Sequence, residues 1–214
     1  MRFCLIVILS ILVIWNCVLI TENPERLTVS TVDNKAYVVK KNYANHETAS
    51  NILARLNHIN TTLIKHLERK YGNTRLSSNV EFLTGNYDGD VLQEHTPRST
   101  VNTSYVLNKG DLIKLCLRDQ TTGEFHDFDT LLFVNLHELS HLLDKEYGHN
   151  NSFWTGFKFI LKEAHSIGLY TPVDYETSPV GYCGIEINNN PFFNIYDNNH
   201  YEICTGPFCD HKKN

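Results

Sequence analysis

The residues 137–141, His-Glu-Leu-Ser-His, are the part of this 214-residue sequence whose types and spacing could do chemistry. Four residues advance an α-helix by about 400°, so on a helix His137 and His141 project from one face, one turn apart. That spacing allows both imidazoles to reach one Zn²⁺ at about 2.0–2.1 Å, with Glu138 beside them. We therefore expect His137 and His141 to be metal ligands and Glu138 to be a general base.

The alternative interpretation is a pair of core histidines that hydrogen-bond to Glu138 and hold no metal. The apolar residues around the motif argue against it, because they would bury a His-Glu-His turn whose polar groups are costly to satisfy without a metal. These apolar neighbours are Leu131, Leu132, Phe133, Val134, Leu136, Leu139, Leu142 and Leu143.

Catalytic zinc has three protein ligands and one open position, so a third ligand is needed. His149 is the first candidate, because the preceding Gly148 suits a turn that brings the chain back to the metal. Glu163 is the rival, since zinc peptidases also use a glutamate from a later helix. The only methionine is Met1, so no Met-turn lies beneath the site.

The motif at 137–141, followed by His149 and Phe153-Trp154, resembles the pattern of WLM-type and SprT-like zinc metallopeptidases. The similarity is greater to WLM-like proteins of large DNA viruses, and it covers about residues 30 to 195. It includes Thr103-Ser104-Tyr105, Asn108-Lys109-Gly110, Cys116-Leu117-Arg118 and Pro179-Val180-Gly181-Tyr182-Cys183-Gly184. The resemblance implies a zincin-like α+β domain, peptidase chemistry, His137, His141 and His149 as zinc ligands, and Glu138 as base.

The elements that must position these residues are predicted by periodicity. Apolar residues at three- and four-residue steps predict helices over 46–71, 127–144 and 152–167. We expect strands at 36–39 and 80–83, and a hairpin of 103–107 and 112–117 joined by 108–111. Beyond Gly168 we expect loops and short strands. We expect residues 22–214 to form one domain, and the family resemblance implies that it is zincin-like, with a small sheet packed on the site helix.

The first 21 residues differ from the rest, because 3–20 form a nearly unbroken apolar run. An 18-residue helix spans roughly 27 Å, and the exit from the run lacks the small residues of a cleavage site. We expect residues 1–21 to be a retained transmembrane anchor. Arg2 before the run favours a single-pass protein whose C-terminal domain lies on the lumenal or external side.

The formal net charge of −5 and the lack of a basic stripe argue against a nucleic-acid partner. Outside the apolar run, the cysteines Cys116, Cys183, Cys204 and Cys209 could pair in an oxidising compartment.

Several other polar residues are assigned roles outside the site. Cys204 and Cys209, with His211, could form half of a zinc site, but no second pair of ligands completes it, and we interpret them as a local disulfide or free thiols. We expect His126 to lie at the surface or at a helix cap and not to be a metal ligand. Asp127 and Asp129 could cap the helix that begins there or orient a ligand histidine, and we expect them to cap it. His165 and His200 are interpreted as ordinary polar residues, and Tyr170 and Tyr182 as packing residues.

The chemistry that these residues favour is zinc-assisted hydrolysis of a peptide bond in a protein or peptide substrate. Zinc lowers the pKa of water, and Glu138 takes its proton and passes it to the leaving amine. Two alternatives are a non-catalytic zinc-binding viral membrane or virion protein, and a hydrolase of a non-peptide amide. A purely structural zinc site has no need of Glu138, which favours an enzyme.

Overall fold

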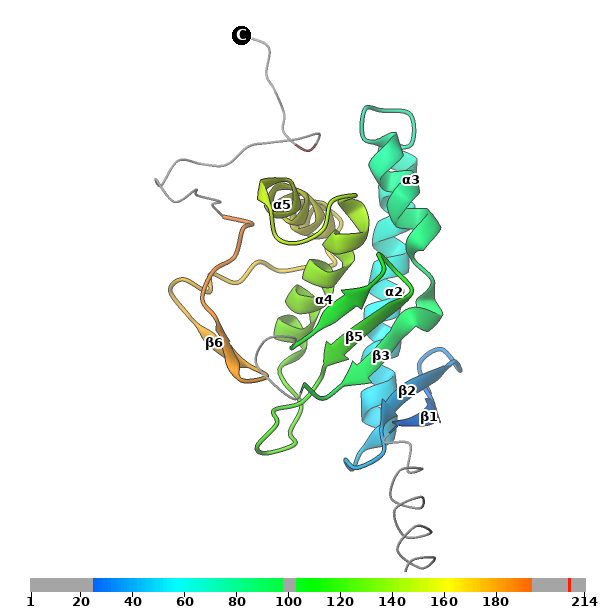
Figure 1. Cartoon of the computed structure of the whole chain (residues 1–214), viewed down its shortest axis with the longest axis vertical. Helices are drawn as coiled ribbons and strands as arrows, with labels where there is room; N and C mark the ends of the chain where they lie inside the picture. Colours follow the sequence, from blue (N-terminus) through cyan, green and yellow to red (C-terminus); the bar gives the residue numbers. More distant parts are fainter. Residues whose placement is uncertain (1–24, 98–102, 194–207, 209–214) are drawn as a thin grey trace, which may run out of the picture.

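The structure is a computed structural model that describes residues 25–97, 103–193 and 208. It has the α+β architecture expected from the sequence, with a mixed five-stranded sheet and four helices (Figure 1). The strand order is β1-β2-β3-β5-β4, in which β2, β3 and β5 are parallel and the two outer strands are antiparallel to their neighbours. The strands are β1 (Glu25–Val29), β2 (Ala36–Lys40), β3 (Leu92–His95), β4 (Tyr105–Leu107) and β5 (Leu112–Cys116).

Helices α2 and α4 pack against different strands of the sheet. Helix α2 (His46–Tyr71) packs on β1, β2 and β3, and helix α4 (Phe128–Leu143) packs on β4 and β5 (Figure 1). Helix α3 (Ser77–Asn86) contacts α2 and α4, and helix α5 (Asn151–Ser166) contacts α4 and α2. A short 3-10 helix, η1 (Gly89–Val91), precedes β3, and a separate hairpin of β6 (Val180–Tyr182) and β7 (Ile185–Ile187) follows α5.

Helix α4 is held in place by the burial of its side chains in the hydrophobic core. Leu136, Leu139, Leu142 and Leu143 are fully buried, and twelve of the sixteen residues of the helix are buried, so nearly its whole circumference is packed. Burying one such leucine stabilises the fold by about 2 kcal/mol. The helix that carries the histidines is therefore held by the core and not by the site itself.

Two sequence predictions between α2 and β4 need correction or completion. Residues 80–83, expected as a strand, lie in α3. Of these four, Val80 and Leu83 are buried, and their three-residue spacing places both on one helical face against α2 and α4. Packing of that face outweighs the strand propensity of Val80 and Phe82. The sequence left β3 unassigned, and the buried Glu94 in it hides the apolar alternation of a strand.

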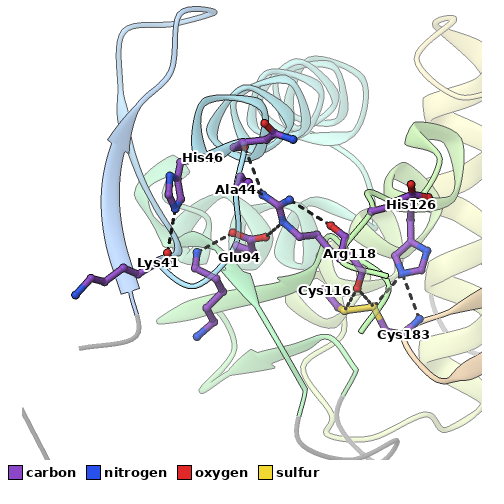
Figure 2. Close-up of polar contacts among 12 residues, drawn as sticks. Lys41, Ala44, His46, Glu94, Cys116, Arg118, His126 and Cys183 are labelled. Carbon is purple, nitrogen blue, oxygen red and sulfur yellow. Dashed lines mark hydrogen bonds and ion pairs between the residues drawn. A yellow bond between two sulfur atoms is a disulfide. The ribbon is translucent and has the colours of Figure 1, made fainter. Parts of the chain in front are cut away.

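The predicted hairpin of β4 and β5 is confirmed, with Leu107 opposite Leu112. Beside it, Arg118 Nε donates to Glu94 Oε1 over 2.7 Å, and Arg118 Nη2 donates to the Ala44 carbonyl over 2.9 Å (Figure 2). These contacts join β3, the residues after β5 and the chain before α2 in one buried polar cluster.

A disulfide attaches the β6–β7 hairpin to the main sheet. It joins Cys116, at the end of β5, to Cys183, in the turn between β6 and β7, over a sequence separation of 67 residues (Figure 2). The two other cysteines considered for pairing, Cys204 and Cys209, lie outside the described residues, as do His200 and His211.

Within the ranges that the structure describes, no helix is both long and apolar enough to cross a membrane. The apolar run 3–20 lies outside those ranges, so the predicted anchor stays a prediction.

Candidate metal centre and active site

Helix α4 places His137, Glu138 and His141 near its C-terminal end. It begins as predicted at an Asp127 cap, whose side chain accepts a hydrogen bond from the backbone N–H of Asp129 over 2.9 Å. The ring centroids of His137 and His141 are 5.1 Å apart, because four residues place both rings on one face. The helix predicted from the sequence therefore brings the two histidines together.

The third imidazole comes from the loop between α4 and α5. Gly148 has a φ of +85°, in the left-handed region that glycine adopts without strain, and it reverses the chain after the helix. His149 Nε2 then lies 2.9 Å from His137 Nε2, and its ring centroid lies 4.8 Å from that of His141. Asn150 caps α5 by accepting a hydrogen bond from the backbone N–H of Phe153 over 2.8 Å.

Phe153 packs against all three imidazoles. Its ring centroid lies 4.3 Å from that of His141, 4.7 Å from that of His149 and 4.9 Å from that of His137. The Phe153 side chain is fully buried in the core. It therefore forms a fixed aromatic wall that restricts rotation of the three rings.

The three ligand atoms fit a zinc ion. They lie within 4.8 Å of one another, and nitrogens at 2.0–2.1 Å from a tetrahedral ion are about 3.4 Å apart. Burial and the neighbouring imidazoles lower the pKa of His137 well below its usual value, and burial, His149 and Lys109 lower the pKa of His141 to about 3. Burial also lowers the pKa of His149. Neutral imidazole is the form that binds a metal, so this donor set suits zinc.

Glu138 lies beside these imidazoles with 4% of its surface exposed. Burial raises the pKa of its carboxyl group to about 8. A divalent cation held by the neighbouring imidazoles would stabilise the ionised carboxylate. A carboxyl group in this position is suited to exchange a proton with a substrate group at the metal.

Lys109 contacts the candidate site, although no role in the site was predicted for it from the sequence. It lies in the turn between β4 and β5 with a φ of +62° and is 7% exposed. Its Nζ donates to the carbonyl oxygens of His141 over 3.0 Å and Asp144 over 2.7 Å, and also to that of Glu146. These carbonyls belong to the end of α4 and the start of the loop that carries His149. The sequence shows a lysine between Asn108 and Gly110, but it does not show which carbonyl oxygens accept hydrogen bonds from this lysine.

Two hollows open onto the site. The smaller, about 220 Å³, is lined by β4, Lys109 and the residues 147–149. The larger, about 450 Å³, is lined by residues of α4, α5, β7 and the segment after β7. Both share Ser104, His137, Glu138 and His149, so two of the candidate ligands and the candidate base lie where the two hollows meet, and His141 lines the smaller hollow.

Glu163, the rival third ligand, is directed elsewhere. Its carboxylate accepts hydrogen bonds from Lys70 Nζ over 2.9 Å, Tyr71 Oη over 2.7 Å and His66 Nε2 over 2.8 Å. Burial raises the pKa of Glu163, but these hydrogen bonds outweigh it and hold the pKa below its usual value. Glu163 joins α5 to α2, and the geometry favours His149 as the third ligand.

Two tyrosines considered in the sequence differ in position. Tyr170 is buried and its hydroxyl accepts a hydrogen bond from Asn190 Nδ2 over 2.7 Å, which is the expected packing role. Tyr182 instead lines the larger hollow, and its hydroxyl donates to the Cys116 carbonyl over 2.8 Å and shares a 2.6 Å hydrogen bond with Ser104. Tyr182 thereby connects the hairpin to the wall of the site.

A second group of potential ligands consists of Cys116, His126 and Cys183. His126 Nε2 lies 3.2 Å from Cys183 Sγ and accepts the backbone N–H of Cys183 over 3.3 Å (Figure 2). The expectation that His126 lies at the surface or at a cap holds only in part, because the residue is partly exposed but its ring packs against the disulfide and Tyr182. The hairpin residues that cover it are far away in the sequence.

A match to the WLM domain model over residues 33–182 shows that the chain belongs to the WLM domain family. The resemblance recognised in the motif is thereby confirmed at the level of the family.

Individual relatives agree with this membership. The chain is 31% identical over 171 residues to an uncharacterized protein of Acanthamoeba polyphaga mimivirus, a match covering 79% of this chain and 86% of that protein. It is 39% identical over 84 residues to an uncharacterized protein of Invertebrate iridescent virus 6, covering 37% of this chain and 44% of that one. A third match, to DNA-dependent metalloprotease WSS1 homolog 2 of Schizosaccharomyces pombe, has 34% identity over 76 residues and covers 36% and 26% of the two chains.

Among solved structures, the chain is similar to crystalline Wss1 from Saccharomyces cerevisiae. The TM-score is 0.45 at 21% identity, and the match covers 60% of this chain and 86% of that one.

Proposed function

We propose that this chain is a zinc-dependent metallopeptidase in which His137, His141 and His149 hold the metal and Glu138 is the general base. The observation that carries the proposal is the convergence of three imidazoles within 4.8 Å beside a buried carboxyl group that lines both hollows. Family membership and the similarity to a fungal metalloprotease support it.

In this proposal zinc, when bound, supplies a Lewis acid that polarises the scissile carbonyl and lowers the pKa of water toward about 7. Glu138 accepts the proton of the attacking water and passes it to the leaving amine. His137, His141 and His149 would hold the divalent cation, and the charge of that cation would keep Glu138 ionised. Phe153 restricts rotation of the three imidazole rings, and Lys109 holds the start of the loop that carries His149. The site is therefore organised before substrate arrives.

An extended peptide suits the surface beside the site. Among the described strands, β4 is an outer strand that pairs with β5 only, and its Tyr105 and Val106 line the smaller hollow. A substrate backbone that adds to this edge would gain main-chain hydrogen bonds and pass Glu138. This arrangement favours a protein or peptide over a small non-peptide amide, and Glu138 favours an enzyme over a non-catalytic zinc protein.

Nucleic acid is not part of the proposal. One relative is named as DNA-dependent, but the formal net charge of this chain is −5. Binding to a phosphate backbone needs clustered positive charge. We propose an activity that does not require DNA.

We further propose that residues 3–20 anchor the protein in a membrane, with the domain on the lumenal or external side. The length and apolarity of the run support the anchor, and the Cys116–Cys183 disulfide suits an oxidising compartment. Alkaline carbonate extraction of membranes should leave the full chain in the pellet. Recovery of a soluble product that begins near Thr21 would instead identify a cleaved signal peptide.

The enzymatic proposal is tested by metal analysis and proteolysis of the purified full-length chain in detergent. We expect about one zinc per chain, cleavage of an unfolded protein substrate, loss of cleavage with a chelator and recovery on adding zinc. A chain that binds no zinc at neutral pH would contradict the proposal.

A further inference from the structure

We infer that this site selects polypeptides with a bulky apolar side chain next to the cleaved bond, and that the larger hollow receives that side chain. The inference rests on the proposed function and adds the substrate class to it.

The walls of the larger hollow are mainly apolar and come from three separate elements. The hollow measures about 450 Å³, within the roughly 300–1,000 Å³ typical of ligand sites. Its apolar lining residues are Phe133 and Val134 of α4, Trp154 and Phe157 of α5, and Ile185 and Ile187 of β7. Ile185 is 39% exposed, and Trp154 and Ile187 are partly exposed. A substrate side chain that covered this surface would remove it from water, which favours binding in proportion to the apolar area.

The position of the hollow ties it to the residue at the cleaved bond. His137, Glu138 and His149 line both the hollow and the proposed reaction centre. A side chain can therefore enter the hollow while its own backbone lies beside Glu138. The hollow is a continuation of the candidate active site and not a separate surface groove.

The charges of the lining disfavour acidic side chains. Among the described lining residues there is no lysine or arginine, and the ionisable acids are Glu138 and Glu186. A substrate carboxylate in the hollow would lose hydration and would lie near the carboxylate of Glu186. The smaller hollow differs, because it contains Lys109 and two tyrosines. The structure thus assigns apolar selectivity to one side of the reaction centre only.

The wall formed by β7 is fixed before substrate binds. The disulfide between Cys116 and Cys183 and the hydrogen bond from Tyr182 to the Cys116 carbonyl attach the β6–β7 hairpin to β5. A preformed wall loses little conformational freedom when a side chain fills the hollow. We therefore expect the hollow to discriminate strongly between substrate side chains of different size.

The first test is the cleavage pattern of the full-length chain on a random-sequence peptide library, with the products sequenced by mass spectrometry. We expect Phe, Leu, Ile, Met and Trp to be enriched about tenfold or more over Asp and Glu at one position next to the cleaved bond. The variant Ile187→Lys should shift that position toward Asp and Glu. The variant Ile187→Trp, which fills the hollow, should shift it toward Ala and Gly. Val32→Lys, the matched change at a 52% exposed position, should keep the wild-type pattern.

A binding measurement separates failure of this inference from failure of the proposed function. Calorimetry on the zinc-loaded chain would compare peptide hydroxamates that carry Phe, Ala or Asp beside the zinc-binding group. We expect the Phe compound to bind about tenfold or more tightly than the others, and Ile187→Lys to abolish that preference. Equal affinities, or a preference unchanged in Ile187→Lys, would overturn the inference even if the chain cleaves peptides. A preference for Phe without any cleavage would support the hollow and count against the proposed catalysis.

Discussion

Among the residues that the structure describes, two groups of potential metal ligands contain the same number of donors but differ in the interactions that those donors already make. In the group of Cys116, His126 and Cys183, the sulfurs are bonded to each other and His126 Nε2 accepts a backbone N–H. In the group of His137, His141 and His149, three imidazoles lie together beside a buried carboxyl group that lines both hollows. Ligand atoms that lie close together are therefore not sufficient to identify a metal site. Donors that are not bonded to one another in a disulfide, and that lie beside a possible base, distinguish a candidate reaction centre from a structural cluster.

The change Glu138→Gln should have the largest effect on activity, because only one of the two groups has a possible base. The amide keeps the shape of the side chain but cannot take a proton, so kcat should fall about a thousandfold while zinc content stays the same. Steady-state kinetics and metal analysis on one preparation check both values. The matched change Glu81→Gln, at an exposed position of α3, should alter neither. Full activity of Glu138→Gln would exclude Glu138 as the base.

The pair His149→Ala and His126→Ala compares the groups directly. Removing a ligand should weaken zinc binding at least about a hundredfold, since loss of outer-shell partners alone costs 10–100-fold. His126→Ala should leave zinc affinity unchanged, because His126 packs on the disulfide. Competition with a chromophoric chelator measures both affinities. Loss of zinc in His126→Ala with retention in His149→Ala would reverse the assignment.

Replacing both Cys116 and Cys183 with serine should lower stability without removing the metal. Opening a disulfide that closes a loop of this size lowers the free energy of unfolding by about 2–4 kcal/mol. Denaturant unfolding of the double variant gives this difference, and metal analysis should still find about one zinc per chain. Loss of zinc from the folded variant would show that the cysteine group takes part in metal binding.

The variant Glu163→Gln tests the rival ligand through pH. Hydrogen bonds from Lys70, Tyr71 and His66 hold the folded-state pKa of Glu163 below its unfolded value of 4.5. The stability that follows is present above about pH 4.5 and is lost as the pH falls through the folded-state pKa. Glu163→Gln should therefore lower the free energy of unfolding by about 1–2 kcal/mol at pH 7 and by less in acid. Unfolding curves from pH 7 to pH 3 measure the trend. A loss of zinc at pH 7 would instead return Glu163 to the list of ligands.

The parts of the site that could be predicted are those set by local spacing. His137 and His141 share a face because four residues make about one helical turn, and Gly148 supplies the turn before His149. The hairpin of β4 and β5 could be predicted for the same reason, because the residues 108–111 that join its strands form a short turn. The contacts that could not be predicted join residues far apart, such as Lys109 with Asp144, 35 residues away, or Cys116 with Cys183, 67 residues away.

The fold shows the same limit. Helices α2, α4 and α5 carry strong apolar periodicity, and their existence follows from it. Helix α3 was mistaken for a strand, because the segment contains Val80 and Phe82 and its helical face is defined only by α2 and α4. Strand β3 was missed because its Glu94 is buried by pairing with Arg118, which no local pattern reveals.

The most direct test of the account is X-ray absorption at the zinc edge of the purified full-length chain. Metal held by His137, His141 and His149 with one open position should show only nitrogen and oxygen scatterers at about 2.0–2.1 Å, with the multiple scattering of imidazole. That signal should be retained in the variant with serine at Cys116 and Cys183. Sulfur scatterers at about 2.3 Å would place the zinc in the cysteine group and contradict the account.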